Sequence, residues 1–408
     1  MDRIKSIPQA LVAVTNRIKR RPRVLAAVAI GVCLVLIVSS FVFLIGPGSS
    51  GGGSPSPAPT GSSIAALPTP ATTPTPTLPA LVPSITPSAT PISGVAGVLY
   101  PDLTGSYADL DGVLTTPALA HRLPMAIMVD DAPAARPQAG FNGASIVYQA
   151  PADGGQTRYM LVFQEGSSAD VGPVRSARPY FVRWAAEYHA LLGHYGGDNQ
   201  SLTQVIPGLA KSIYNMDALN GGGCPYHRIS TRLMPHNAYT NTSALRACLP
   251  KKHYPTTIDP TVPLRPFTDD LPLSQRPSAA TITIPYRSQV VGYTYVRSTD
   301  SYLRSVGGRP QIDQSNKTRV TARNVIVLWQ TLTTYTEPGH NRPVVGQIGT
   351  GKAMVFRDGQ AIPATWQKKN DTDLTRLYDA SGQEIPLVRG RIFIQIVPTG
   401  TKVTHTQK

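Results

Sequence analysis

Residues 144–165 read ASIVYQAPADGGQTRYMLVFQE and contain two apolar segments on either side of a turn. Pro151, Gly154 and Gly155 separate the segments 144–150 and 157–165. Because proline and glycine interrupt strands and favour turns, this stretch predicts a β-hairpin. A further strand is predicted upstream at 123–131 (LPMAIMVDD), which is apolar until it ends in two aspartates.

The rest of the chain predicts helices first and strands afterwards. Segment 179–192 (PYFVRWAAEYHALL) has apolar residues at helical spacing and proline at its first turn, so we expect a helix there. A second helix is expected at 242–249, capped by Thr242. From 279 onwards, segments that alternate apolar and polar residues are separated by Gly, Asp and Asn, which predicts seven or eight strands in a small barrel or sandwich.

The N-terminal region predicts a membrane anchor. Segment 24–46 has no charged side chain and is long enough to cross a bilayer at about 1.5 Å per residue. The residues before it, 1–23, carry seven basic side chains against one acid, which places the N-terminus in the cytoplasm and the rest outside. A cleaved signal peptide and a lipoprotein signal at Cys33 are alternatives, but the apolar segment is long for a signal core and Cys33 lies within it.

Residues 47–97 predict a disordered stalk, because they contain twelve prolines, many Ser, Thr and Gly, and no charge. The expected fold class is α+β: an N-terminal α/β domain followed by a mostly β, barrel- or sandwich-like domain, preceded by one transmembrane helix. The expected organisation is a cytoplasmic stub (1–23), a transmembrane helix (24–46), the stalk (47–97), the α/β domain (98–249), a connector (250–277), the β domain (278–400) and a tail (401–408).

Charge and motifs exclude several classes of function. The formal net charge is +15, of which +6 belongs to residues 1–23 beside the membrane segment, so no nucleic-acid partner is predicted. No HExxH or paired CxxC occurs, and neither a metal nor a cofactor is predicted. Segment 346–353 (GQIGTGKA) resembles a phosphate-binding loop, but Ala353 stands where Ser or Thr must reach magnesium.

A series of motifs resembles the YerB-like proteins, which share the N- and C-terminal parts of domain of unknown function 3048. The motifs are MAIMVDDAPAARPQAGF (125–141), VGPVRSARPYF (171–181) and PHNAYTNTSAL (235–245), then ARNVIVLW (322–329), GTGKAMVFRDG (349–359) and GQEIPLVRGRIFIQIVP (382–398). The resemblance implies a bacterial envelope protein, and some members of the family are linked to cell-wall synthesis. This chain differs in its anchor, in Asp131 where the family commonly has asparagine, and in Asp153 where glutamate is usual.

The segment GPVRSAR (172–178) predicts an anion-binding site. A helix that begins at Pro179 leaves its first N–H groups unpaired, and Arg175, Ser176 and Arg178 would add two guanidinium groups and a hydroxyl beside them. The alternative is that the anion is internal. In that case Asp130, Asp131, Asp153 or Glu165 would pair with the loop.

Other polar residues near the predicted strand ends extend this candidate site. Asp130, Asp131 and Asp153 are candidate acid and base groups for glycan chemistry. Candidate ligand contacts besides the arginine loop are Arg136, Arg158, His194, His236 and Asn237. His194 taken alone is more typical of a buried structural histidine. Cys224 with His227 does not match a known thiol-enzyme signature, and a Cys224–Cys248 disulfide is left open.

The sequence thus predicts a single-pass cell-membrane protein with an extracytoplasmic C-terminal part. Its predicted function is to bind an acidic cell-wall component, such as peptidoglycan, or a wall-synthesis protein through the arginine loop. One alternative is a glycan-acting cell-wall enzyme that uses the aspartates, and a second is a non-catalytic membrane adaptor. Whether the protein is an enzyme stays open at this point.

Overall fold

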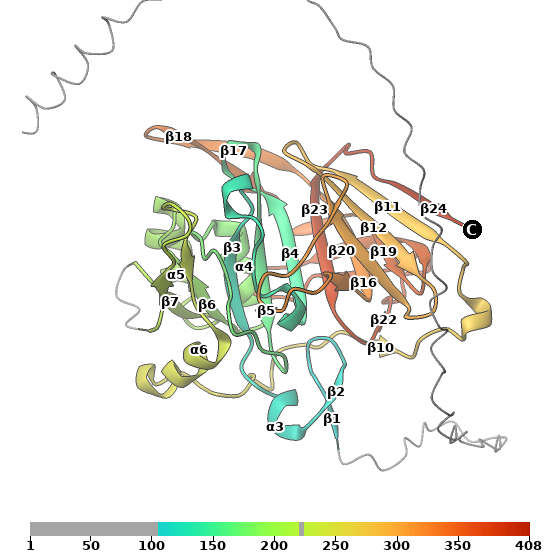
Figure 1. The fold of residues 1–408 in the computed structure, drawn as a ribbon, viewed down its shortest axis with the longest axis horizontal. Helices are drawn as coiled ribbons and strands as arrows, with labels where there is room; N and C mark the ends of the chain where they lie inside the picture. The colour runs from blue at the N-terminus through green and yellow to red at the C-terminus, as the bar shows by residue number, and fades with distance from the viewer. Residues whose placement is uncertain (1–104, 220–223) are drawn as a thin grey trace, which may run out of the picture. The chain divides into compact units, whose positions relative to one another are not determined.

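The predicted hairpin lies at the centre of a ten-stranded mixed sheet (Figure 1). The computed structural model describes residues 105–219 and 224–408. The two hairpin strands pair antiparallel, as predicted, and the strand expected at 123–131 pairs with the second of them. The sheet order is β21 (Arg376–Tyr378), β20 (Gln360–Lys368), β19 (Gly349–Arg357), β16 (Asn324–Gln330), β23 (Ile392–Pro398), β4 (Ile146–Pro151), β5 (Thr157–Phe163), β3 (Met125–Asp130), β6 (Leu191–His194) and β7 (Tyr214–Asp217).

The two halves of the chain meet within this sheet. Strand β23, from the C-terminal half, pairs parallel with β4 on one side and with β16 on the other. The segments expected as an α/β domain and a separate β domain therefore share one layer, and the described residues group as one compact unit. The expected connector contains η5 (Pro250–Lys252), β10 (Phe267–Thr268) and η6 (Leu273–Gln275), and β10 pairs with β22 (Leu387–Val388).

A second sheet covers one face of the first and forms the sandwich. Its order is β14 (Arg309–Pro310), β13 (Ser301–Val306), β12 (Val290–Val296), β11 (Ala280–Pro285) and β24 (Thr404–Gln407), with β15 (Thr321–Ala322) beside β13. Side chains of β11 alternate between buried and exposed, as expected for a strand with one face in the core. Ile282 and Tyr293 of this sheet share a buried cluster with Val325 and Phe393 of the ten-stranded sheet.

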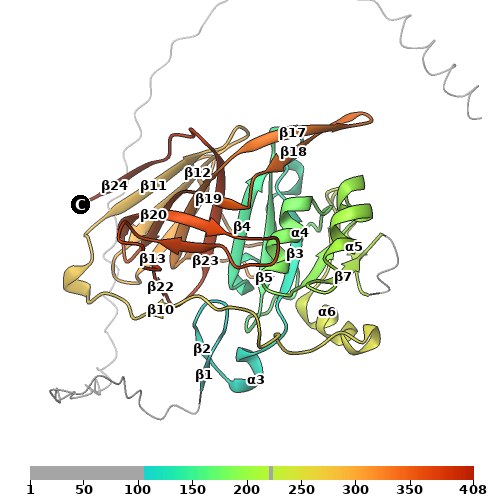
Figure 2. The same cartoon turned by 180° about the vertical axis from the view of Figure 1, so that it is seen from behind.

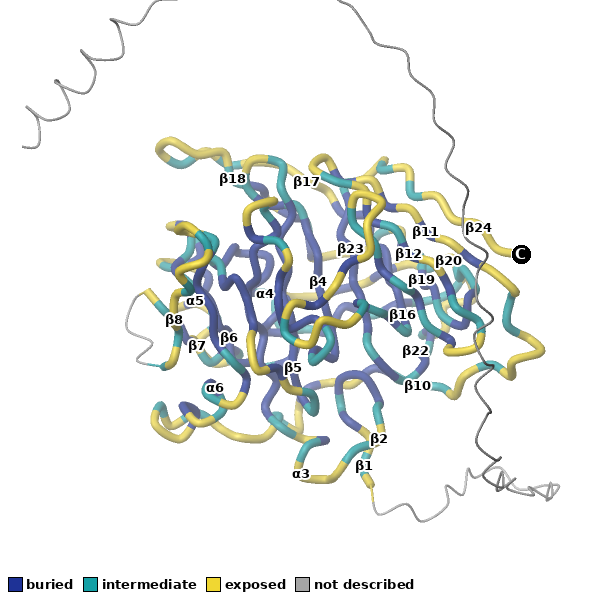
Figure 3. Tube along the Cα trace, viewed as in Figure 1, coloured by how far each residue is buried: buried dark blue, intermediate teal, exposed yellow. Residues whose placement is uncertain are grey.

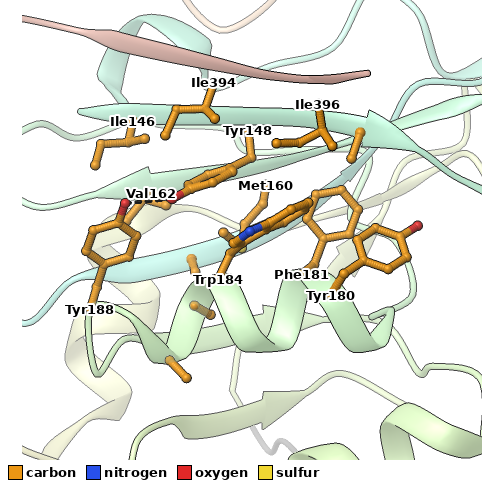
Figure 4. Packing of buried hydrophobic residues seen from close by; sticks show 14 of the residues in the cluster. Ile146, Tyr148, Met160, Val162, Tyr180, Phe181, Trp184, Tyr188, Ile394 and Ile396 are labelled. Carbon is orange, nitrogen blue, oxygen red and sulfur yellow. Dashed lines mark hydrogen bonds between the residues drawn. The ribbon is translucent and has the colours of Figure 1, made fainter. Parts of the chain in front are cut away.

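Helix α4 (Pro179–Ala186) covers the opposite face of the ten-stranded sheet (Figures 2 and 4). Trp184 stacks on Tyr148 of β4 with ring centroids 5.2 Å apart, and Phe181 meets Trp184 edge to face at 5.3 Å. The Tyr148 and Tyr188 hydroxyls lie 2.7 Å apart, so these buried polar atoms satisfy each other. These contacts fix α4, and with it the arginine loop that precedes it.

Both predicted helices exist, with changed boundaries. The first ends at Ala186 rather than at 192, because the apolar residues after it enter β6. The second is α6 (Thr242–Cys248), and its cap is Asn241, whose side chain accepts a hydrogen bond from the Ala244 N–H at 2.7 Å. The predicted cap at Thr242 is wrong because its hydroxyl donates to the Ser168 carbonyl.

The remaining elements are short. The described part of the chain is mostly β, with few helices. The helices and helical turns are α3 (Pro117–Ala120), η1 (Pro133–Ala135), η2 (Phe141–Gly143), η3 (Asp153–Gly155), η4 (Ser201–Val205) and α5 (Ile206–Gly208). The two-stranded pairs are β1 (Ser106–Tyr107) with β2 (Leu114–Thr115), β8 (His227–Arg228) with β9 (Ala238–Tyr239), and β17 (Leu332–Glu337) with β18 (His340–Val345). The β17–β18 hairpin projects beyond the main sheet and is largely exposed (Figure 3).

The predicted membrane anchor precedes the described residues. The stub (1–23), the transmembrane segment (24–46) and the stalk (47–97) lie outside the described residues. Within the described residues, none of the helices has both the length and the apolar character that a bilayer span requires.

Candidate functional site

Several of the polar residues singled out in the sequence lie at one end of the strands of the ten-stranded sheet. Strands β3, β6 and β7 are parallel neighbours, as are β4, β23 and β16, and β5 runs antiparallel to both β3 and β4. The carboxyl ends of all the parallel strands therefore lie on the same side, where open sheets commonly form ligand sites. Asp130 ends β3, Asp153 follows β4, Arg158 lies near the start of β5, and His194 ends β6.

Asp153 is surrounded by guanidinium groups. Its carboxylate accepts a hydrogen bond from Arg178 Nε at 3.1 Å and another from Arg178 Nη2. Arg342 Nη1 and Arg158 Nη2 lie 3.1 and 3.6 Å from Asp153 Oδ2. Burial alone would raise the pKa of Asp153, but the hydrogen bond from Arg178 and the charges of the arginines lower it to about 2. Asp153 is therefore ionised at neutral pH and poorly suited to donate a proton.

The side chain of Arg178, the residue at the N-cap position of α4, is closed to an external anion. Its side chain is 5% exposed and also lies 3.6 Å from Asp198 Oδ2. Pro179 and Tyr180, the first residues of α4, are buried. The internal pairing that the sequence left open is thus what the structure has at Arg178, and the helix N-terminus lies beneath the protein's own side chains.

Arg158 and Ser176 complete this internal network. Arg158 Nη1 donates a hydrogen bond to the Ser176 carbonyl at 2.7 Å. Burial and the nearby charge of Arg178 lower the pKa of Arg158 to about 10, so it stays charged at neutral pH. Arg158 joins the turn after β4 to the arginine loop, and both residues serve here to position that loop.

Asp131 is enclosed by hydrogen-bond donors and is 1% exposed. The donors are Arg136 Nε (3.1 Å), Gln138 Nε2 (2.9 Å), Gln149 Nε2 (3.1 Å), the Thr157 hydroxyl and Gln289 Nε2. Arg136 also donates to the Asp131 carbonyl at 2.8 Å. Both carboxylate oxygens are therefore occupied, which makes Asp131 an anchor for the loop that contains Arg136.

A buried arginine that the sequence did not indicate supports this enclosure. Arg304 is fully buried, and it donates to Tyr293 OH at 3.0 Å and to the Gln149 side chain. Its guanidinium lies 5.3 Å from the Phe393 ring centroid, within range of a cation–π contact. Arg304 lies in the alternating strand β13, where a charged residue is ordinarily read as solvent-facing, so no local pattern identifies it.

Asp130 holds two basic side chains that reach solvent. His236 Nδ1 lies 2.7 Å from Asp130 Oδ2, and Arg175 Nε lies 3.3 Å from the same oxygen. The carboxylate is 6% exposed, whereas the side chains of Arg175 and His236 are 29% and 23% exposed. The structure thus brings Asp130, Arg175 and His236 together, and it leaves the two basic groups with surface that faces outward.

His194 and Asn237 have structural environments. His194 is fully buried, with Nδ1 2.8 Å from the Gly196 carbonyl and Nε2 2.7 Å from Asn215 Oδ1. Asn237 donates to the Ile229 carbonyl at 3.1 Å. Its side-chain oxygen accepts a hydrogen bond from Arg228 Nη1 at 2.6 Å, which ties Arg228 to the residue that follows His236 in the sequence.

A cleft of about 770 Å³ lies at the carboxyl ends of β4 and β23. The sequence did not indicate this cleft. The turn after β4 (153–157) lines it, together with the turn after β11 (285–287) and the β17–β18 hairpin. Of the residues predicted for the site, only Asp153 lines this cleft. The hairpin is tied down by Arg342, which contacts Asp153 and also lies 2.7 Å from Glu337 Oε1.

An acidic cluster lies elsewhere in the fold. Carboxylate oxygens of Asp270, Asp300 and Asp358 lie within 4.8 Å of one another. Arg323 lies 3.1 Å from Asp300 Oδ2, and Arg357 lies 2.7 Å from Asp358 Oδ2. Burial raises the pKa of Asp300. These carboxylates are therefore compensated by arginines.

Cys224 and Cys248 form the disulfide that the sequence left open, with Cα atoms 6.0 Å apart. Cys224 is therefore not a free thiol next to His227. The bond connects α6 to the segment that leads to Arg228 and His236. Structural disulfides are typical of proteins in oxidising compartments.

Comparisons with known proteins agree with this architecture. The N-terminal domain of the DUF3048 family matches residues 110–255, and its C-terminal domain matches residues 281–394. The lipoprotein candidate YerB of Bacillus subtilis (strain 168) is 28% identical over 295 residues, which are 71% of this chain and 86% of that protein. The crystal structure of Bacillus subtilis YerB superposes with a TM-score of 0.65 at 26% identity, covering 74% of this chain and 99% of that one. The chain belongs to the DUF3048 family, the family of YerB, and contains both of its domains.

Proposed function

We propose that this protein is an extracytoplasmic, membrane-anchored envelope protein that binds an acidic cell-wall component or an acidic surface of a wall-synthesis protein. Three observations support the location. The relative YerB is named as a lipoprotein candidate, segment 24–46 is uncharged behind a basic stub, and the Cys224–Cys248 disulfide suits an oxidising compartment.

The pairing at Asp130 carries the proposal. Arg175 and His236 share one buried carboxylate, and both keep outward-facing surface. A guanidinium group has five N–H donors, so a single contact through Nε leaves donors for a second oxyanion. The proposed anion contact thus includes Arg175 but not Arg178, although the sequence predicted that both arginines of the loop take part.

Arg228 extends the basic surface next to this pair. It is exposed, its guanidinium lies 4.5 Å from the Tyr195 ring centroid, and it donates to Asn237, the neighbour of His236. We call Arg175, Arg228 and His236 the basic surface. Basic groups held in place by buried partners attract acidic ligands with less loss of side-chain entropy than free ones do.

Acid–base chemistry on a glycan has less support. Asp131 has its carboxylate oxygens occupied by internal donors, and the pKa of Asp153 is lowered to about 2. A general acid requires a pKa near the working pH. Burial without cationic partners would raise the pKa of a carboxyl group towards that value. Binding is therefore the favoured function, and the non-catalytic adaptor is its variant in which the acidic ligand is another membrane protein.

Co-sedimentation with isolated peptidoglycan tests this function. The full-length protein in mild detergent is expected to sediment with peptidoglycan, to release no soluble fragments, and to bind less as salt rises. Arg175→Ala should reduce the bound fraction, whereas Arg183→Ala, which removes an arginine that is paired with Asp371 and is not part of the basic surface, should not. Release of fragments that Asp130→Asn abolishes would favour the enzyme. Binding that Arg175→Ala leaves unchanged would refute the role of the basic surface.

A further inference from the structure

The cleft between the β17–β18 hairpin and the turn after β11 is separate from the basic surface. Its lining includes neither Arg175 nor His236. Its volume of about 770 Å³ falls within the range of sites that hold small molecules or short polymer segments. Because β4 and β23 end at its floor, with Pro151 and Pro398 in the lining, the cleft is built on the rigid main sheet.

The chemistry of the lining is polar but mostly uncharged. Gln156 and Asn341 offer amides, and Thr334 and Thr401 offer hydroxyls. Apolar surface comes from Leu332 and from four proline rings: Pro151, Pro285, Pro343 and Pro398. Amides and hydroxyls that both donate and accept, arranged beside rigid apolar surface, suit a ligand with many hydroxyl groups and apolar C–H faces, which is the pattern of a sugar.

Among the described residues that line the cleft, Arg287 is the one arginine or lysine. Arg287 is exposed, and within residues 105–219 and 224–408 it forms no ion pair. Its stem packs against Gly155, where an added Cβ would lie 2.9 Å from Arg287 Cδ, and Gly155 has a φ of +76°. A side chain at this position would be strained and would push Arg287 away, so the glycine lets the arginine lie across the turn with its head group free.

The β17–β18 hairpin presents a face to the cleft, rather than an edge. Leu332 and Thr334 are alternate residues of β17, and Pro343, which also lines the cleft, is the cross-strand partner of Thr334. Side chains of alternate residues and their cross-strand partners share one face of a ribbon. A peptide that added a strand would need the unpaired backbone of an edge, so this geometry favours a ligand read by side chains.

We propose that this cleft binds a short oligosaccharide that carries a carboxylate, with Arg287 contacting the carboxylate and Thr334 and Asn341 contacting sugar hydroxyls or amides. The ligand class rests on the extracytoplasmic location proposed above, but the site does not depend on the basic surface. A wall glycan segment with lactyl carboxylates has this chemistry.

Calorimetric titration of the full-length protein in mild detergent tests the site. The probes are a tetrasaccharide of N-acetylated amino sugars with lactyl carboxylates, the neutral chitin tetrasaccharide, and an acidic peptide of similar length. The acidic tetrasaccharide is expected to bind roughly tenfold more tightly than the neutral one, which corresponds to one charge-assisted contact. Arg287→Ala should remove that difference, whereas Arg309→Ala, at an exposed arginine of β14, should preserve it.

Thr334→Trp should fill the cleft and weaken both sugars at least tenfold, whereas Thr333→Trp, an exposed neighbour on the other face of β17, should leave both unchanged. The inference is overturned if neither sugar binds, if Thr334→Trp has no effect, or if the peptide competes for the cleft with equal affinity. Arg175→Ala should leave sugar binding intact. Failure of the Thr334 and Arg287 variants therefore stays distinguishable from failure of the basic surface.

Discussion

The Asp153 carboxylate and the Arg178 guanidinium, 25 residues apart in the sequence, form a two-point ion pair at the start of α4. At Arg178, this pair is the internal pairing that the sequence left open as an alternative to a ligand. Arg178 is satisfied inside the protein, so the surface available to an acidic ligand is at Arg175.

Asp153→Asn is expected to destabilise the protein by about 2 kcal/mol or more, because it leaves Arg178 and Arg158 with little compensating charge in a mostly buried site. Urea unfolding at pH 7 measures this loss. Asp371→Asn removes the partner of Arg183 at a more exposed site and should cost less than about 1 kcal/mol. Equal losses in the two variants would contradict the importance of the Asp153 cluster.

The same residue predicts a dependence of stability on pH. The pKa of Asp153 is lowered from 3.8 to about 2, so its ionised form is favoured by folding. Its contribution is fully present above about pH 4 and is lost as the pH falls from about 4 towards 2. Asp153→Asn should therefore flatten the fall in the free energy of unfolding in this window. An unchanged slope would show that Asp153 does not drive the acid loss.

Glu187→Gln should be strongly destabilising. Glu187 Oε1 lies 2.8 Å from Lys368 Nζ, both side chains are fully buried, and the pair joins the end of α4 to β20. Removing one charge from a buried pair typically costs about 3–5 kcal/mol. Glu384→Gln, at the partly exposed pair with Arg376, is the control and should cost about 1 kcal/mol or less. A cost for Glu187→Gln near that of the control would contradict the buried pairing.

The Cys224–Cys248 disulfide should stabilise the fold by about 3 kcal/mol, because it closes a loop with a sequence separation of 24 residues in the unfolded chain. Urea unfolding of the wild type with and without reductant measures this term. The double variant Cys224→Ser, Cys248→Ser should match the reduced wild type and should not respond to reductant. A reductant effect of similar size in the double variant would assign the change to another cause.

Much of the local structure was predictable from the sequence. The β4–β5 hairpin, β3 and α6 follow from apolar pattern and turn residues. The predicted first helix was too long, because the apolar residues 190–192 suit a buried strand as well as a helix face. The joining of the two halves was not predictable, since the parallel pairing of β4 with β23 links residues about 250 positions apart.

The candidate site was also predictable only in part. The sequence placed Asp130, Arg175 and His236 in one candidate site, because Asp130 and His236 lie near predicted strand ends and Arg175 lies in the loop before a predicted helix. It gave no signal for Arg304 and Arg342, which contact Gln149 and Asp153, respectively, in the other half of the chain. It also missed the cleft, which exists only because the β17–β18 hairpin lies over the turn after β4.

The most direct test of the account measures the affinity of the full-length protein in mild detergent for a purified anionic wall polymer at low salt. The account predicts that Arg175→Ala weakens binding roughly tenfold or more, as expected for the loss of one charge-assisted contact, and that Arg175→Lys restores part of it. Arg183→Ala should bind like the wild type. Equal affinity of the wild type and Arg175→Ala would contradict the claim that the basic surface binds an acidic ligand.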